Sequence, residues 1–209
     1  MTRILPGVIA MAIIVVASNI LVQFLILDGF LTWGAFTYPL AFLVTDVMNR
    51  IYGAPAARRV VFVGLIVGIT CSLIGSQIML EFGPAVPIRV AIASATAFGA
   101  AQLLDIALFN RMRGGVWWKA PLVSTCVSSI VDTAIFFTIA FGALFNGFSA
   151  LAADQVIWAQ DAVPFLTFGP LVPLWVSLAV ADWGVKIAVA LIALVPFRMI
   201  VGRRAQPVT

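Results

Sequence analysis

The sequence predicts an all-α polytopic membrane protein, a bundle of six transmembrane helices. Of its 209 residues, 63% are hydrophobic and only 10% are charged, whereas about a quarter of a soluble domain is charged. The mean hydropathy is +1.16, and a soluble fold of this length cannot hide so much apolar surface. The apolar residues also gather in long segments, as expected for helices that cross about 30 Å of hydrocarbon. We therefore expect a single transmembrane domain over residues 1–209.

Six apolar segments follow one another along the chain, and turn residues or charges separate them. The expected spans are roughly 4–27, 35–52, 60–80, 88–110, 118–144 and 172–197. The first is longer than the apolar core of a cleavable signal peptide, which has about 7–15 residues. The second is short and carries Pro39 near its start.

The connection 145–171 is longer than the others and is rich in aromatic residues and proline. We favour an interfacial segment that places Trp158 and several phenylalanines at the level of the lipid headgroups. The alternative is an outer lid over a substrate path.

Basic residues predict the orientation, because cytoplasmic loops of membrane proteins are rich in Lys and Arg. Ten of the 12 basic residues fall on one side of the predicted topology, namely Arg3, Arg50, Arg58, Arg59, Arg111, Arg113, Lys119, Arg198, Arg203 and Arg204. The connections on the other side carry acidic residues. Both termini are therefore expected in the cytoplasm. The net charge of +4 reports this topology, so we expect the lipid bilayer and no nucleic acid as a partner.

Several chemistries lack their usual residues. The sequence has no histidine, which is the commonest general base and transition-metal ligand. Its two cysteines, Cys71 and Cys126, lie in apolar runs and are too few for a zinc site. No GxxxxGK[ST] loop for ATP is present. We expect no metal, no cofactor and no catalytic site.

The candidate functional residues are charges inside the expected spans. Four carboxylates lie there: Asp46, Asp105, Asp132 and Asp182. An ionised group at mid-bilayer costs at least about 2.5–3.5 kcal/mol, and such groups usually mark a substrate or ion path. Counting along the spans puts three of them near the middle of the membrane, and Asp105 about one turn from the cytoplasmic end.

Two of these carboxylates have different expected surroundings. Asp182 and Lys186 are four residues apart on one helix face. They form either a permanent internal ion pair or a pair that opens when substrate or a proton arrives. Asp132 has only hydroxyls expected near it, including Ser128 one turn earlier. This makes it the favoured proton carrier or ligand acceptor.

Amide side chains accompany the carboxylates. Asn19 and Gln23 share a face of the first span, and Gln102 and Asp105 share a face of the fourth. Amides and carboxylates on several helices predict a polar pocket. Two helix ends also look alike, with Asn-Arg following Asp46 and Asp105, so two inverted three-helix halves are one arrangement to consider.

Motifs along most of the chain resemble the queuosine precursor transporter family, also called the vitamin-uptake-transporter-related family. The matching stretches are Ser18-Asn19-Ile-Leu-Val-Gln23, Thr32-Trp33-Gly34-Ala35-Phe36-Thr-Tyr-Pro39, Phe42-Leu-Val-Thr45-Asp46-Val-Met-Asn-Arg50-Ile-Tyr-Gly53, Arg89 with Ala93-Ser94-Ala95, Gln102-Leu-Leu-Asp105, Phe109-Asn110-Arg111, Trp117-Trp118, Asp132-Thr with Phe136-Phe137, and Asp182 with Lys186. Together they cover the chain from residue 18 to about residue 197.

The resemblance implies import of a deazapurine precursor of the tRNA base queuosine across the bacterial inner membrane. The expected substrates are 7-cyano-7-deazaguanine and 7-aminomethyl-7-deazaguanine, carried by secondary or facilitated transport. A carboxylate can accept from the amine and ring NH of such a ligand, an amide can serve its carbonyl, and an aromatic ring can cover its face. The residues expected to bind it are Asn19, Gln23, Asp46, Arg89, Gln102, Asp105, Ser128, Asp132, Phe136, Asp182 and Lys186.

Other functions remain open at this stage. The chain has the size of a substrate-binding subunit of an energy-coupling-factor importer, which works with a separate ATP-driven module. An intramembrane enzyme is a weaker alternative, because no recognised catalytic signature surrounds the aspartates. Small-residue helix faces also allow a homodimer.

Overall fold

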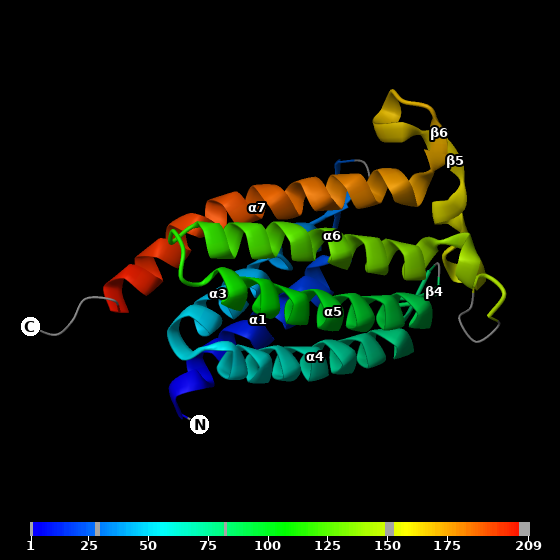
Figure 1. Cartoon of the computed structure of the whole chain (residues 1–209). Helices are drawn as coiled ribbons and strands as arrows, with labels where there is room; N and C mark the ends of the chain where they lie inside the picture. Colours follow the sequence, from blue (N-terminus) through cyan, green and yellow to red (C-terminus); the bar gives the residue numbers. More distant parts are fainter. Residues whose placement is uncertain (1, 28–29, 82, 149–152, 205–209) are drawn as a thin grey trace, which may run out of the picture.

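Long apolar helices dominate the computed structural model, which describes residues 2–27, 30–81, 83–148 and 153–204 (Figure 1). The helices are α1 (Leu5–Leu21), α2 (Gly34–Thr37), α3 (Leu40–Tyr52), α4 (Ala54–Gln77), α5 (Ile88–Met112), α6 (Lys119–Phe141) and α7 (Leu174–Arg204). The all-α prediction is confirmed.

Four of the helices within the described residues, α4 to α7, are long and apolar enough to cross a membrane. The apolar helix α1 is shorter, with 17 residues, and α3 has 13. A polytopic membrane protein is therefore confirmed, whereas the count of six crossings stays a prediction. The expected second span is divided into α2 and α3 at Tyr38-Pro39, where proline cannot donate a backbone hydrogen bond.

Short hairpins and 3-10 turns connect the helices at the end opposite the termini. Three antiparallel pairs form there: β1 (Leu25–Ile26) with β2 (Leu31–Thr32), β3 (Met79–Leu80) with β4 (Gly83–Pro84), and β5 (Ala162–Pro164) with β6 (Leu171–Pro173). The 3-10 turns at that end are η3 (Ala143–Phe145), η5 (Ala153–Gln155), η6 (Ile157–Gln160) and η7 (Phe165–Thr167). A further 3-10 turn, η1 (Thr2–Ile4), precedes α1 near the N-terminus. The long connection 145–171 therefore contains η5, η6, η7 and β5.

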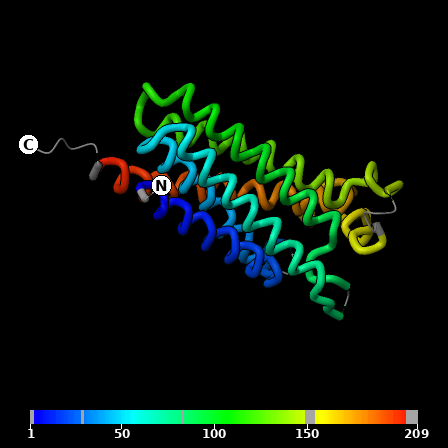
Figure 2. Tube along the Cα trace, turned by 90° about the horizontal axis from the view of Figure 1, so that it is seen from below, coloured from blue at the N-terminus to red at the C-terminus, as the bar shows by residue number. Residues whose placement is uncertain are grey.

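The helices pack as a row in which α4 touches α1 and α5, and α6 touches α5 and α7. The side-by-side course of α1 and α4 is visible in Figure 2. The helix α3 packs inside this arrangement against α4, α5 and α7. Close approach of α1 requires Gly64 on α4, because a Cβ there would lie 2.6 Å from the Met11 Cγ atom.

Both termini lie at the same end of the bundle, together with the α3–α4 and α5–α6 connections (Figure 1). Gly53, with φ of 85°, lets α4 begin directly after α3. Arg50 and Arg113 then join the two connections, since each guanidinium donates to the other's backbone carbonyl, at 2.5 and 2.7 Å. The structure thus gathers the basic connections at one end, and the cytoplasmic location of that end remains a prediction.

Cysteine labelling can test this orientation. Gly114 and Asp154 are both exposed and lie at opposite ends of the bundle. In a variant without Cys71 and Cys126, we expect Gly114→Cys to react with an impermeant maleimide only after the membrane is opened. We expect Asp154→Cys to react in intact spheroplasts. The reverse pattern would invert the topology.

Candidate functional site

A cavity of about 390 Å³ opens among the helices in the half of the bundle away from the termini. Its walls come from the later turns of α1 and α6, the earlier turns of α5 and α7, and the middle of α4, together with the connection before α3. Ligand pockets usually measure about 300–1,000 Å³, so the space suits one small molecule. Its polar lining residues are Ser18, Asn19, Gln23, Thr32, Tyr38, Ser72, Ser94, Asp132, Asp182 and Lys186.

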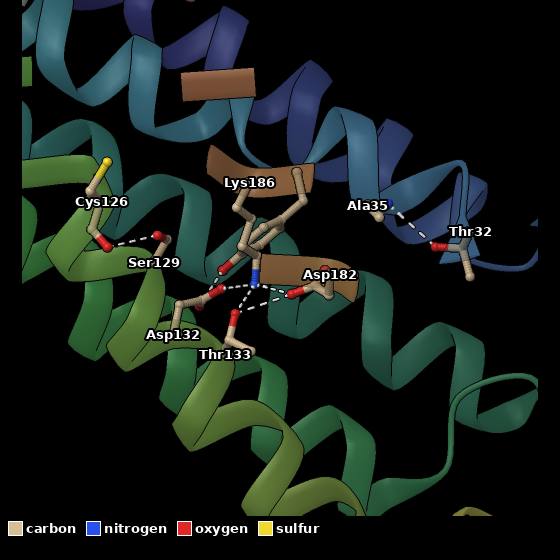
Figure 3. Close-up of polar contacts among 9 residues, drawn as sticks. Thr32, Ala35, Cys126, Ser129, Asp132, Thr133, Asp182 and Lys186 are labelled. Atoms are coloured by element: carbon tan, nitrogen blue, oxygen red, sulfur yellow. Dashed lines mark hydrogen bonds and ion pairs between the residues drawn. The ribbon is translucent and has the colours of Figure 1, made fainter. Parts of the chain in front are cut away.

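One wall of the cavity carries a buried ion cluster built from α6 and α7. The Lys186 Nζ atom lies 2.6 Å from Asp132 Oδ2 and 2.6 Å from Asp182 Oδ2. It also donates to Thr133 Oγ1 at 2.9 Å, so all three ammonium donors have partners. Figure 3 shows the ammonium group between the two carboxylates. Two carboxylates and one ammonium give the cluster a formal charge of −1 when all three are ionised.

Two hydroxyl groups complete this cluster. Thr133 donates from Oγ1 to Asp182 Oδ2 at 3.1 Å. The Tyr38 hydroxyl, from the connection between α2 and α3, donates to Asp132 Oδ1 at 2.9 Å. The Lys186 Nζ atom also lies 5.5 Å from the centre of the Tyr38 ring, within the range of a cation–π interaction. The cluster therefore ties the first half of the chain to α6 and α7.

The expected contact between Asp182 and Lys186 is confirmed by this geometry. The expectation that Asp132 has only hydroxyls nearby is wrong, because Lys186 bonds directly to it. Spacing along one helix predicts that Lys186 contacts Asp182, because both lie on α7. It does not predict that Asp132, on α6, faces the same lysine. Only the packing of α6 against α7 brings Asp132 to the same ammonium group.

The predicted amides Asn19 and Gln23 line the cavity at its α1 wall. Asn19 donates from Nδ2 to the Val15 carbonyl at 2.9 Å. Gln23 donates from Nε2 to the Ala85 carbonyl at 3.1 Å, which fastens the end of α1 to the segment before α5. Among the described residues, no hydrogen bond to either amide oxygen is formed.

Aromatic rings cover much of the remaining wall. Phe136 lines the cavity, as predicted, and packs edge-on against Phe137 with ring centres 5.1 Å apart. Trp158, from the connection 145–171, reaches the cavity and meets Phe141 at 5.8 Å. This contact favours the lid interpretation of that connection over a purely interfacial one.

Four of the predicted residues lie outside the cavity, in the half nearer the termini. Asp46, Gln102, Asp105 and Ser128 are buried between α3, α5 and α6. Asp46 lies beside Thr125 rather than beside Asp132, so the expectation of a common depth for Asp46 and Asp132 is wrong. The expected depth of Asp46 depends on a span that starts at residue 35, whereas α3 starts at Leu40.

Arg89 also lies outside the cavity, although it is fully buried. Its Nε donates to the Ile139 carbonyl at 2.7 Å and its Nη1 to Asn146 Oδ1 at 2.9 Å. Its Nη2 donates to the Gly142 carbonyl. The guanidinium therefore satisfies carbonyls that the end of α6 leaves unpaired, and it holds the start of the connection 145–171.

Sequence reasoning missed several residues that the structure brings to these clusters, among them Tyr38, Thr125 and Thr133. Thr133 directly follows Asp132, and Tyr38 precedes the helix break at Pro39, so the sequence contained a detectable signal for both.

The part of the chain that the structure describes has no group of three or more His, Cys, Asp or Glu residues able to hold a metal ion.

Apolar helices around a cavity with buried charges define a multi-pass membrane protein with a cavity of the size of a small molecule. Residues 32–201 match the family described as "Putative vitamin uptake transporter". The chain belongs to this family of membrane transporters.

Curated relatives carry a more specific name. The chain is 32% identical over 197 residues to the queuosine precursor transporter of Escherichia coli K12, covering 88% of this chain and 79% of the relative. It is 35% identical over 177 residues to the probable queuosine precursor transporter of Haemophilus influenzae, covering 79% and 66% respectively. A protein of the same name in Bacillus subtilis is 32% identical over 130 residues, covering 53% and 56%. No solved structure matches the chain significantly.

Removal of Lys186 should destabilise the fold. Lys186→Met leaves Asp132 and Asp182 without their common cation, and breaking a buried ion pair typically costs about 3–5 kcal/mol. The triple variant Lys186→Met/Asp132→Asn/Asp182→Asn removes all three charges and should recover much of that loss. Unfolding in detergent measures both, with the exposed Lys119→Met as control. Equal stability of Lys186→Met and the parent protein would show that the cluster is not required for the fold.

Proposed function

We propose that this protein imports queuosine precursors across the bacterial inner membrane and binds them in the cavity beside Lys186. The names of the relatives support this substrate class. The single observation that carries the proposal is the ion cluster of Asp132, Asp182 and Lys186 on the wall of a cavity of about 390 Å³. A hydrogen-bonding planar ligand needs such a combination of charged and apolar surface.

Asp182 is the carboxylate best placed to bind the ligand. Its side chain is 17% exposed, whereas that of Asp132 is 3% exposed. Both oxygens of Asp132 already accept hydrogen bonds, from Tyr38 and Lys186. Thr133 and Lys186 both bond to Oδ2 of Asp182, so its Oδ1 remains for the ligand. A deazaguanine presents an exocyclic amine and a ring NH side by side, and a carboxylate accepts from both.

The charge of the cluster favours one of the two precursors. An aminomethyl group is a primary alkyl amine, which is protonated at neutral pH as lysine is. A cluster with a formal charge of −1 attracts that cation and does not attract a neutral cyano group. We therefore propose 7-aminomethyl-7-deazaguanine as the better ligand and 7-cyano-7-deazaguanine as the weaker one.

The aromatic wall supports recognition of the flat ring system. Phe98 and Phe136 line the cavity from α5 and α6, and rings of this kind offer apolar faces to a heterocycle. Trp158 is half exposed at the cavity. We propose that it closes over the bound ligand as part of the lid.

Ligand binding can be measured by thermal stabilisation of the purified protein, because a ligand that binds only the folded state raises the apparent stability. We expect both precursors to raise the melting temperature, and the aminomethyl compound to do so at lower concentration. Asp182→Asn should weaken binding of the aminomethyl compound at least about tenfold, since a charge-assisted hydrogen bond is lost. The exposed Thr96→Ala variant should bind normally. No stabilisation by either compound at millimolar concentration would exclude this substrate.

Uptake of labelled precursor into liposomes that contain only this protein distinguishes a self-sufficient carrier from a subunit of an ATP-driven importer. We expect uptake without partners. Asp132→Asn should abolish uptake while the protein remains inserted, because Tyr38 and Lys186 lose their common anionic partner. Binding without any uptake by the parent protein would favour the energy-coupling-factor alternative.

A further inference from the structure

A second buried polar cluster lies in the half of the bundle near the termini. Asp46 on α3 and Asp105 on α5 are 3% and 0% exposed. The Thr125 Oγ1 atom on α6 lies 3.3 Å from Asp46 Oδ2 and 3.4 Å from Asp105 Oδ1. Both carboxyl groups therefore lie around one hydroxyl oxygen. Because the Thr125 hydroxyl has one proton and an ionised carboxylate can only accept, both contacts are hydrogen bonds only if one carboxyl group is protonated and donates to Oγ1.

No cationic side chain pairs with either carboxyl group within the described ranges. Arg50 lies one turn further along α3 but donates to the Arg113 carbonyl at 2.5 Å. From α6 the cluster meets the hydroxyls of Ser124 and Thr125. From α7 the space beside Asp46 is lined by apolar side chains, Ala190, Ala193, Leu194 and Phe197. Two buried carboxyl groups that share one hydroxyl, without a cation, repel each other when both are ionised.

Several fully buried polar atoms around this pair have no hydrogen-bond partner: Asp46 Oδ1, Asp105 Oδ2, Asn49 Oδ1, Gln102 Nε2 and Ser128 Oγ. Gln102 lies one turn before Asp105 on the same face of α5, and Ser128 lies one turn after Thr125 on α6. Unpartnered buried groups cost about 1–3 kcal/mol each. A functional state in which this region is solvated or binds a ligand would satisfy them.

The space beside this pair suits a proton better than a metal ion. The space beside Asp46 and Thr125 is about 10 Å³, whereas a single water needs at least about 10–15 Å³. The described residues also lack a group of three or more carboxylate, thiolate or imidazole ligands. A proton between two carboxyl oxygens needs neither space nor further ligands.

We propose that Asp46 and Asp105 share a transported proton, which couples precursor uptake to the proton gradient. This inference rests on the proposed function. The proton enters from the cavity side past Ser128, which lies on α6 between Thr125 and Asp132, a distance of about 10 Å over seven residues. When α3 separates from α5 and α6, the shared carboxyl O–H bond breaks. Water at the basic end takes the proton, and two carboxylates remain.

Infrared spectroscopy and uptake test the proposal on the full-length protein in liposomes. The C=O stretching band of a protonated carboxyl group should be present at neutral pH in the parent protein and in Ser129→Ala. That control is buried and bonds only to its own helix, at the Cys126 carbonyl. The band should be absent from Asp46→Asn/Asp105→Asn. An inward gradient of one pH unit should support up to about tenfold accumulation if one proton moves with each substrate.

The double variant should still bind precursor and exchange labelled for unlabelled precursor, but without accumulation. The inference is overturned if the parent protein lacks the carboxyl band, if the double variant keeps it, or if a sodium gradient rather than a proton gradient drives uptake. A parent protein that neither binds nor exchanges precursor would refute the proposed function instead, and the infrared result would still decide the shared proton.

Discussion

The ammonium group of Lys186 between two carboxylates is the interaction on which the rest of the candidate site depends. A lone charge in the hydrocarbon region costs at least about 2.5–3.5 kcal/mol, and Lys186 offsets this cost through three bonded donors. Those bonds require α6 and α7 to pack at one register, and Tyr38 brings the connection between α2 and α3 to the same point. The three charged residues of this cluster also form part of the wall of the cavity, so the packing of α6 against α7 shapes that wall.

Two polar layers divide the bundle along its length. The layer with Lys186 lines a cavity, whereas Asp46 and Asp105 in the other layer are buried, and apolar side chains of α7 lie beside Asp46. At the end of the bundle near the termini, hydrogen bonds between Arg50 and Arg113 join the α3–α4 and α5–α6 connections. The cavity thus lies in the half of the bundle away from the termini, and the buried carboxyl groups of Asp46 and Asp105 lie in the half nearer to them.

Composition and the spacing of charges predicted the all-α membrane class, the gathering of basic residues at one end and the pair of Asp182 with Lys186. Six of the eleven expected site residues line one cavity: Asn19, Gln23, Asp132, Phe136, Asp182 and Lys186. What the sequence could not reveal is which helix faces which. Asp132 pairs with Lys186, which lies on α7. Asp46 and Asp105 both contact Thr125. Arg89 donates to a backbone carbonyl of α6 and does not line the cavity. Each of these outcomes depends on packing between helices rather than on periodicity within one.

A structure of the protein crystallised from lipid with 7-aminomethyl-7-deazaguanine tests the central claim most directly. The account predicts the ligand in the cavity, with its amine and ring NH on Asp182 and the ring beside Phe136. Ligand density between α3, α5 and α6 at Asp46 and Asp105, with the cavity empty, would contradict it.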